Sequence, residues 1–248
     1  MNPPVPPNSS NRCWAIVPAA GVGRRMGGDL PKQYLGLLDR PLIEHTLMRL
    51  GDHPRIHGLV VALSAGDEYW STVRIETACS FTTTIGGDER CHSVLAALDA
   101  LRDTARPDEW VLVHDAARPC IHPDDIDRLI DTVERRGASG GLLGLPVSDT
   151  VKRTGADGLV TETVDRQGLW RAATPQMFRY GELRVALHAA IAAGELVTDE
   201  AAAMERSGIR PLMVEGRADN IKVTRPGDLE LAALFISQQA FHHRGSSQ

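Results

Sequence analysis

Residues 13–26 read CWAIVPAAGVGRRM, an apolar run that ends in two spaced glycines and a pair of arginines. The apolar half predicts a buried strand. Gly21 and Gly23 permit a tight turn that a ligand can approach closely, and Lys32 adds a third cation soon after it. Backbone N–H groups beside clustered cations suit a polyphosphate. The stretch therefore predicts a central strand followed by a phosphate-binding turn.

This turn matches neither of the common phosphate-binding loops. It lacks the Gly-Lys-Ser/Thr ending of a P-loop, and Met26 stands where a Rossmann turn has its third glycine. A glycine turn alone is as often a plain connection between a strand and a helix. The basic residues at these positions are what favour an anionic ligand.

The composition is that of one globular α/β domain. The chain has 248 residues, of which 42% are hydrophobic and 24% charged. A net charge of −5 gives no general basis for binding nucleic acid, and no apolar run is long enough to cross a membrane. The four cysteines form no Cys-x-x-Cys pair, which predicts reduced thiols and a cytoplasmic location.

Strand-like runs alternate with helix-like segments along most of the chain. This alternation predicts a Rossmann-like, mostly parallel sheet flanked by helices, with ligands at the carboxyl ends of the strands. We expect one domain over residues 12–240, between a disordered leader at 1–11 and a flexible tail at 241–248. The expected strands are 13–17, 59–63, 81–85, 110–114, 142–147, 209–214 and 221–223, and the expected helices are 42–50, 94–101, 123–133, 180–193, 198–207 and 226–239.

The alternation breaks at residues 146–168. Two strand-like segments, 149–153 and 160–164, flank the turn sequence TGADG. A hairpin of this size has little core and is marginally stable alone. We therefore expect 146–168 to project as a β-arm that packs on a second subunit.

Polar residues follow two further strands. After the strand at 81–85, GGDER offers backbone groups to a ligand, Asp88 is placed to cap the next helix, and Ser93 can hydrogen-bond a flat base. A loop without a ligand explains that segment equally well. Asp115 follows a central apolar strand, where a carboxylate needs a cation or a metal. Mg²⁺ beside phosphates is one reading and an ion pair with Arg118 is the other. His114 is expected to be a packed strand residue and not a base.

Hydroxyl groups and cations near other element ends complete the polar set, at Arg166, Thr174, Thr198 and Lys222. Each of them alone is more often a cap or a turn residue, and Thr198 is a good helix N-cap. Their number favours binding of a phosphomonoester.

In their order, these motifs resemble those of the 2-C-methyl-D-erythritol 4-phosphate cytidylyltransferase family of the non-mevalonate isoprenoid pathway, over about residues 13–239. The matching strings are PAAGVGRRM at 18–26, PKQYL at 31–35, GGDERCHSV at 86–94, VHDAARP at 113–119, SDTVK at 148–152, TVDRQGLW at 163–170, TPQ at 174–176, TDEA at 198–201 and EGRADNIKVTRPGDL at 215–229.

The resemblance implies transfer of a cytidylyl group from CTP to methylerythritol phosphate, with Mg²⁺ or another divalent cation, in a homodimer. The acceptor phosphate is already deprotonated at neutral pH, so no general base is expected. The implied catalytic residues are Arg25, Lys32 and Lys222. The implied nucleotide-binding residues are Pro18, Ala19, Ala20, Gly21, Gly23, Gly87, Asp88, Ser93 and Ala116. The implied acceptor-binding residues are Asp115 (also the metal ligand), Arg118, Thr150, Arg166, Thr174, Thr198 and Lys222, with Thr150 and Arg166 serving the partner's site.

Three alternatives remain open. The acceptor can be ribitol 5-phosphate, although the TVDRQGLW and EGRADNIKVT strings weigh against it. The nucleotide can be GTP or UTP, as in other transferases of this fold. The chain can also be a nucleotide-binding regulator without activity, but such a protein need not keep Arg25, Lys32, Asp115 and Lys222 together.

Overall fold

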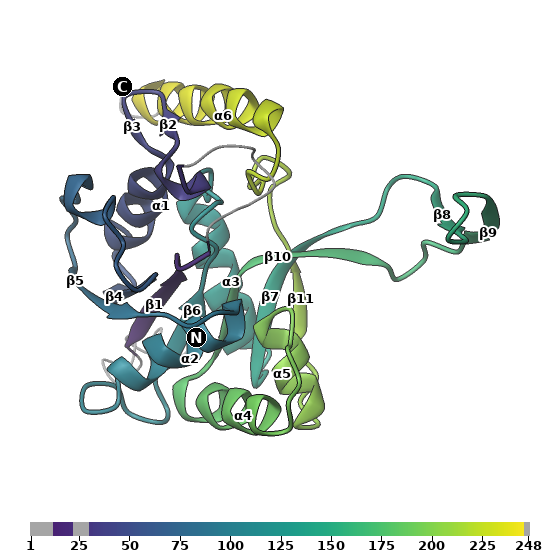
Figure 1. The fold of residues 1–248 in the computed structure, drawn as a ribbon, viewed down its shortest axis with the longest axis horizontal. Coiled ribbons are helices and arrows are strands. Elements are labelled where there is room, and N and C mark those ends of the chain that lie inside the picture. The colour runs from purple at the N-terminus through teal and green to yellow at the C-terminus, as the bar shows by residue number, and fades with distance from the viewer. Residues whose placement is uncertain (1–11, 22–29, 246–248) are drawn as a thin grey trace, which may run out of the picture.

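A seven-stranded sheet of order β11-β7-β10-β6-β1-β4-β5 forms the centre of the molecule. The computed structural model describes residues 12–21 and 30–245 (Figure 1). The strands are β1 (Cys13–Pro18), β4 (Ile56–Leu63), β5 (Ser80–Ile85), β6 (Trp110–Val113), β7 (Gly140–Pro146), β10 (Trp170–Arg179) and β11 (Leu212–Glu215). All neighbouring pairs are parallel except those of β10, which runs antiparallel to β6 and β7. The predicted mostly parallel sheet is confirmed.

Helices cover both faces of this sheet, because side chains along each strand alternate between the faces. Ala15 and Val17 of β1 pack with helices α1 (Leu42–Gly51) and α3 (Pro123–Arg135). Trp14 and Ile16 pack on the other face with α2 (Arg90–Ala100), α4 (Tyr180–Ala192) and α5 (Glu200–Arg206). The sheet with its two helical layers provides a rigid edge on which a site can be built.

Helix α6 (Pro226–Gly245) closes the top of the molecule in Figure 1. It packs through Ala232 and Ile236 on Leu37 of a small hairpin, β2 (Gly36–Leu37) and β3 (Arg40–Pro41). It continues beyond the expected end at Gln239. In the described part of the chain, no helix combines the length and the apolar character that a membrane span requires.

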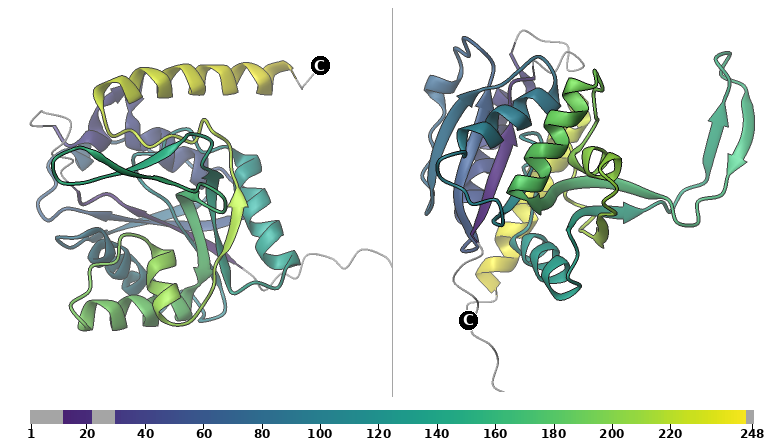
Figure 2. Two further views of the ribbon diagram at one scale, coloured as in Figure 1. Left: turned by 90° about the vertical axis from the view of Figure 1, so that its right-hand side faces the viewer. Right: turned by 90° about the horizontal axis from the view of Figure 1, so that it is seen from below.

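The predicted hairpin at 146–168, called the arm below, is confirmed. Its strands β8 (Val151–Thr154) and β9 (Val160–Val164) pair antiparallel, and the arm extends far from the rest of the chain in the right-hand view of Figure 2. Leu159 is 69% and Val160 60% exposed at its tip. The described residues of one chain therefore provide little cover for the apolar side chains of the arm.

Two local predictions about helix caps were wrong. Helix α5 begins at Glu200, and Asp199 is its N-cap, because the Asp199 side chain accepts the Ala202 N–H. Asp is as good an N-cap as Thr, so the sequence allowed either residue. Asp88 does not cap α2, whose N-cap is Glu89 without a side-chain hydrogen bond.

Two predictions about strands were also wrong. Residues 221–223 form no strand, because the Val223 N–H donates to the Ala117 carbonyl and ties this run to the turn after β6. Strand β10 was not predicted, because Pro175 interrupts its sequence and a proline argues against a central strand. The structure accommodates Pro175 with a register shift between Ala172 and Gln176. The predicted leader, residues 1–11, lies outside the described residues, as do residues 246–248 of the predicted tail.

Candidate active site

A pocket beyond the carboxyl ends of β1, β5 and β6 brings together most residues of the implied nucleotide site. Among its lining residues are Pro18, Ala19, Ala20, Gly21, Lys32, Gly87, Asp88, Ser93, Asp115, Ala116 and Lys222. Gly23 and Arg25 lie outside the described residues. Segments as far apart in sequence as Pro18 and Lys222 thus meet at the edge of the sheet where ligands of open α/β sheets bind.

The segment just before Gly21 is held in place by two hydrogen bonds to the backbone of Ala19. The Ala19 N–H donates to the Ala62 carbonyl at 2.7 Å, and the buried Gln33 amide donates to the Ala19 carbonyl at 2.8 Å. A Cβ placed on Gly21 would meet no described atom within 4 Å. The packing of the described residues therefore does not require glycine here.

The second glycine loop packs against the first one. A Cβ on Gly86 would lie 2.8 Å from the Ala20 Cβ and 2.7 Å from the Ser93 Oγ, so this close approach requires glycine. The Ser93 hydroxyl accepts the Gly87 N–H at 3.2 Å and lies within hydrogen-bond distance of the Gly87 and Glu89 carbonyls. Ser93 therefore shapes the loop, and its contact with a base stays a prediction.

Asp115 is the electrostatic centre of the pocket. It is 7% exposed, and its carboxylate accepts from Arg90 Nε at 3.2 Å, Arg118 Nε at 3.3 Å and Lys222 Nζ at 2.9 Å. Burial acts to raise its pKa, but the charges of Arg90, Lys222 and Arg118 outweigh burial and hold the pKa well below its usual range. The predicted pair with Arg118 is present, and Asp115 is ionised.

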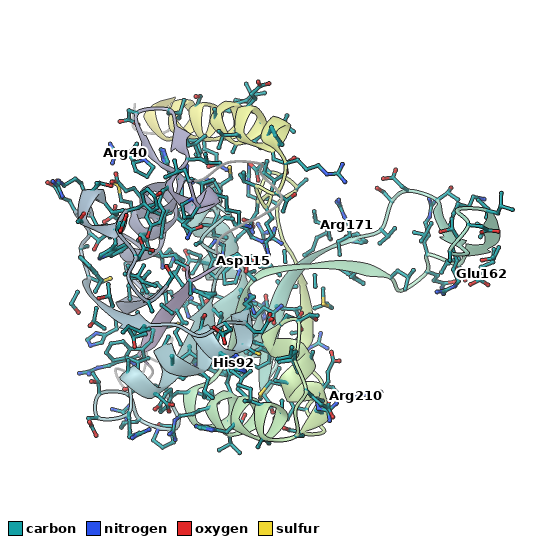
Figure 3. All side chains as sticks on the ribbon, viewed as in Figure 1. Arg40, His92, Asp115, Glu162, Arg171 and Arg210 are labelled. Carbon is teal, nitrogen blue, oxygen red and sulfur yellow. The ribbon has the colours of Figure 1, made fainter. Side chains whose placement is uncertain are left out.

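A second pocket adjoins the first and shares Lys222 with it. Its other cationic lining residues are Arg118, Arg171, Arg217 and Arg225, against the single acid Asp228. The Asp228 Oδ2 accepts from two backbone N–H groups and the Thr224 hydroxyl. Figure 3 shows Arg171 at the root of the arm, to one side of Asp115. The second pocket therefore has the charge that a phosphomonoester requires.

Comparison with known proteins agrees with the geometry. The family model described as 2-C-methyl-D-erythritol 4-phosphate cytidylyltransferase matches residues 13–238. The chain belongs to this family. It is 50% identical over 235 residues to the enzyme of that name from Shewanella amazonensis, covering 95% of this chain and 98% of that protein. The match to the protein of that name from Ectopseudomonas mendocina is 52% identical over 221 residues, covering 89% and 94%.

Solved structures of the family share the fold. The crystal structure of the 2-C-methyl-D-erythritol 4-phosphate cytidylyltransferase from Francisella tularensis superposes with a TM-score of 0.79 at 34% identity, covering 91% of this chain and 100% of that one. The protein of that name from Thermus thermophilus gives a TM-score of 0.73 at 29% identity, covering 90% and 98%. The fold of this cytidylyltransferase-family chain is thereby established independently of its motifs.

His114 and Thr174 support Asp115 in this cytidylyltransferase fold. Burial lowers the pKa of His114 to about 4, so the ring is neutral and carries one N–H. His114 Nε2 lies 3.1 Å from the Arg118 carbonyl, so the proton belongs there and the Thr174 hydroxyl donates to Nδ1, also at 3.1 Å. Thr174 Oγ1 accepts the Asp115 N–H at 3.0 Å. His114 is buried, as predicted, but it directly follows β6 and is not part of the strand, and Thr174 has no second proton to offer an acceptor.

The remaining predicted acceptor residues do not line either pocket within one chain. Thr198 is exposed and precedes α5. Thr150 and Arg166 lie on the arm, where the Arg166 guanidinium donates to the Ser148 carbonyl. In Figure 1 the arm points away from the central sheet. One chain of this cytidylyltransferase family thus does not bring Thr150 and Arg166 to its own Asp115.

Arg90 and Glu200 belong to the site but were not predicted from the sequence. The Arg90 guanidinium binds Glu200 through Nη1 at 2.6 Å and Nη2 at 3.0 Å, and Glu200 is 1% exposed. Both residues lie within matched motifs of this cytidylyltransferase family, but they are 110 positions apart. A single sequence carries no signal that two such residues pair.

Proposed function

We propose that this protein joins CTP to 2-C-methyl-D-erythritol 4-phosphate, forming 4-diphosphocytidyl-2-C-methyl-D-erythritol and pyrophosphate. The main support for this proposal is that two pockets adjoin each other. One pocket is built from two glycine loops, the other is rich in cations, and Lys222 lines both. Two polyanions held in these pockets meet at Lys222. Family membership supports the identity of both substrates.

The proposed reaction is an in-line displacement at phosphorus. An acceptor phosphate oxygen forms a new bond to the α-phosphorus of CTP, the bond from that phosphorus to the α,β-bridging oxygen breaks, and pyrophosphate leaves with the electron pair. The acceptor phosphate needs no base because it is already ionised. Lys32 and Lys222 line the nucleotide pocket and stabilise negative charge that grows on the α-phosphate. Arg25 is a further proposed cation.

Mg²⁺ or another divalent cation is part of the proposal. Within the described residues, no three His, Cys, Asp or Glu side chains are grouped to hold a metal. Mg²⁺ is often held by one or two carboxylates together with substrate phosphates. Asp115 fits this arrangement as an ionised carboxylate that lines the pocket, whereas Glu200 does not line it. When bound, the metal supplies positive charge to the phosphates, and Asp115 is the residue that would hold it.

We propose that the active form is a homodimer in which the arm reaches the partner's second pocket. Leu159, Val160, Leu169 and Trp170 are exposed along or beside the arm, which suits contact with another protein surface. Arg166 and Thr150 would then complete the acceptor site of the partner. The four cysteines form no disulfide, which supports a reducing, cytoplasmic location.

Pyrophosphate release with CTP, Mg²⁺ and a panel of acceptors tests the proposal. We expect the highest kcat/KM with methylerythritol phosphate, lower values with ribitol 5-phosphate, no comparable activity with GTP or UTP, and loss of turnover with a chelator. Faster turnover of ribitol 5-phosphate would reassign the acceptor. Tight CTP binding without turnover of any acceptor would favour the nucleotide-binding regulator.

A further inference from the structure

Arg90 connects the nucleotide loop to Asp115. It is the first residue of α2 and directly follows the loop residues Gly87 to Glu89, which line the nucleotide pocket. Its guanidinium donates to Asp115 through Nε and to Glu200 through both terminal nitrogens. Glu200 therefore fixes the guanidinium in the plane from which Nε reaches Asp115.

The two oxygens of Asp115 have different partners. Arg90 binds Oδ1, whereas Arg118 and Lys222 share Oδ2. The side chain of Lys222 is 37% exposed, compared with 24% for Arg90 and 12% for Arg118. Lys222 also lines both pockets, so it is the partner of Asp115 that can turn toward a substrate phosphate.

Departure of Lys222 leaves each Asp115 oxygen with one cation, because Arg90 keeps Oδ1 and Arg118 keeps Oδ2. Without Arg90, Oδ1 of this nearly buried carboxylate has no cationic partner, and Asp115 depends on Arg118 and Lys222 at Oδ2. Loss of Lys222 would then leave Arg118 as the one cation for the whole carboxylate. Breaking a buried ion pair carries a large penalty. Arg90 thus determines how readily Lys222 can leave.

We propose that Arg90, held by Glu200, is a positioning residue that compensates Asp115 while Lys222 moves from Asp115 to the substrate phosphates. The inference rests on the proposed cytidylyl transfer. Arg90 lines the nucleotide pocket, but its guanidinium is engaged by Asp115 and Glu200. It acts through Asp115, so its loss should slow turnover and leave CTP affinity nearly unchanged.

The decisive comparison uses Arg90→Met, Glu200→Gln and the double variant. Arg90→Met alone also leaves the Glu200 carboxylate buried and unpaired, so a loss of stability is expected there. Glu200→Gln in the same chain removes that charge and restores folding. We expect the folded double variant to show kcat lowered by about tenfold or more, because small displacements of catalytic groups have effects of this size. The dissociation constant of CTP, measured by calorimetry, should stay within about threefold.

A surface pair serves as the matched control. Arg206 and Glu195 form a similar ion pair in which both side chains are more than 40% exposed. We expect Arg206→Met with Glu195→Gln to leave kcat and CTP affinity unchanged. Wild-type kcat in the folded double variant Arg90→Met/Glu200→Gln would show that Arg90 is only structural and would overturn the proposal. So would weaker CTP binding with unchanged kcat, because Arg90 would then act on the nucleotide loop.

A readout besides activity follows Lys222 itself. The chain has only three lysines, Lys32, Lys152 and Lys222. NMR of ¹⁵N-lysine protein can therefore resolve the Lys222 ammonium, assigned with Lys222→Arg. Adding α,β-methylene CTP and the acceptor should shift this signal in the wild type and shift it less in the double variant. An unchanged signal in wild-type protein that binds both ligands would overturn the inference, whereas a wild type that turns over no acceptor would instead reject the proposed function.

Discussion

The nucleotide pocket and the arm both carry residues expected to bind substrate, but they are built in opposite ways. In the pocket, Asp115 is nearly buried and has three cationic partners from separate parts of one chain. On the arm, the ion pair Arg153–Glu162 and the Lys152–Thr163 hydrogen bond join only the two strands of the hairpin. The pocket is complete enough in one chain to define its electrostatics, whereas the described residues of one chain leave most of the arm exposed.

This difference follows from where hydrophobic burial is available. The pocket lies at the edge of a sheet with helices on both faces, and β6 directly before Asp115 is fully buried. In β8 and β9, nearly every residue is exposed. Exposed ion pairs contribute little stability, so they do not replace a core. A second subunit that buries the arm would supply the missing stabilisation and bring Arg166 to a site at the same time.

The largest expected effect is a difference in kcat between substitution of a lysine in the pocket and substitution of a lysine on the arm. Lys32→Ala should lower kcat by about a hundredfold to a thousandfold, since it removes charge that stabilises the transition state. Lys152→Ala is the comparison, because Lys152 is exposed and bonds only to Thr163 within the arm. We expect its kcat to change by less than about threefold. Pyrophosphate release measures both, and equal losses would remove the proposed distinction.

Stability should divide the same two regions. Leu112→Ala in fully buried β6 should lower the free energy of unfolding by about 2–5 kcal/mol, the usual cost of a core cavity. Leu159→Ala at the exposed tip of the arm should change it by less than about 0.5 kcal/mol. Urea denaturation at one fixed protein concentration provides the comparison. A large effect at Leu159 would mean that the tip is buried in the assembled protein.

Mixing two inactive variants tests whether the arm serves a partner. Arg166→Ala and Lys32→Ala should each have little activity, but a heterodimer of the two contains one site with both native residues. Random pairing of equal amounts makes about half the dimers mixed, so about a quarter of wild-type activity should return. Subunit exchange by gentle unfolding and refolding is required. If verified heterodimers stay inactive, each subunit uses its own Arg166, and a fully active monomer in light scattering would reject the dimer.

The predictable part of the fold is the part with local periodic signals. The apolar run at Cys13 to Val17 became β1, and the alternating segments around TGADG became the projecting hairpin. The unpredicted strand, β10, owes its position to pairing with β6 and β7, which overrides the usual disfavour of Pro175. Ile221 and Val223 pack in one cluster with Cys120 near the turn after β6. Two apolar residues on either side of Lys222 give the same sequence pattern in a strand and in such a packed loop.

The candidate site shows the same limit. Motif strings identified the two glycine loops, Asp115 and Lys222, which the fold brings into one pocket. The side chains that pair with these residues could not be predicted from the motif strings. The pairing of Arg90 with Glu200 depends on how α2 and α5 lie over the same face of the sheet. The protonation of His114 and the engaged hydroxyl of Thr174 likewise depend on three-dimensional contacts.

The smallest expected effect is a pH dependence that belongs to the site and not to the arm. The folded-state pKa of His114 is about 4, below the ordinary value near 6.5, so the unfolded chain binds the extra proton between these values. The contribution of neutral His114 to the free energy of unfolding is therefore complete above about pH 6.5 and is lost as the pH falls toward 4. Between pH 7.5 and 5.5 this group should lower the free energy of unfolding by about 1 kcal/mol.

Comparison of wild type with His114→Gln isolates this effect, because the other titrating groups contribute to both proteins and cancel in the difference. Urea denaturation at pH 7.5 and 5.5 should show that the variant loses less stability on acidification, by about 1 kcal/mol. His57→Gln, at an exposed position, is the control for a histidine-to-glutamine substitution as such. The arm contains no histidine, so amide exchange of β8 and β9 should not show this dependence in an isolated subunit. An identical pH dependence in wild type and His114→Gln would mean that His114 is not held neutral by burial. The assignment of the Thr174 hydroxyl as a donor to His114 Nδ1 would then also be wrong.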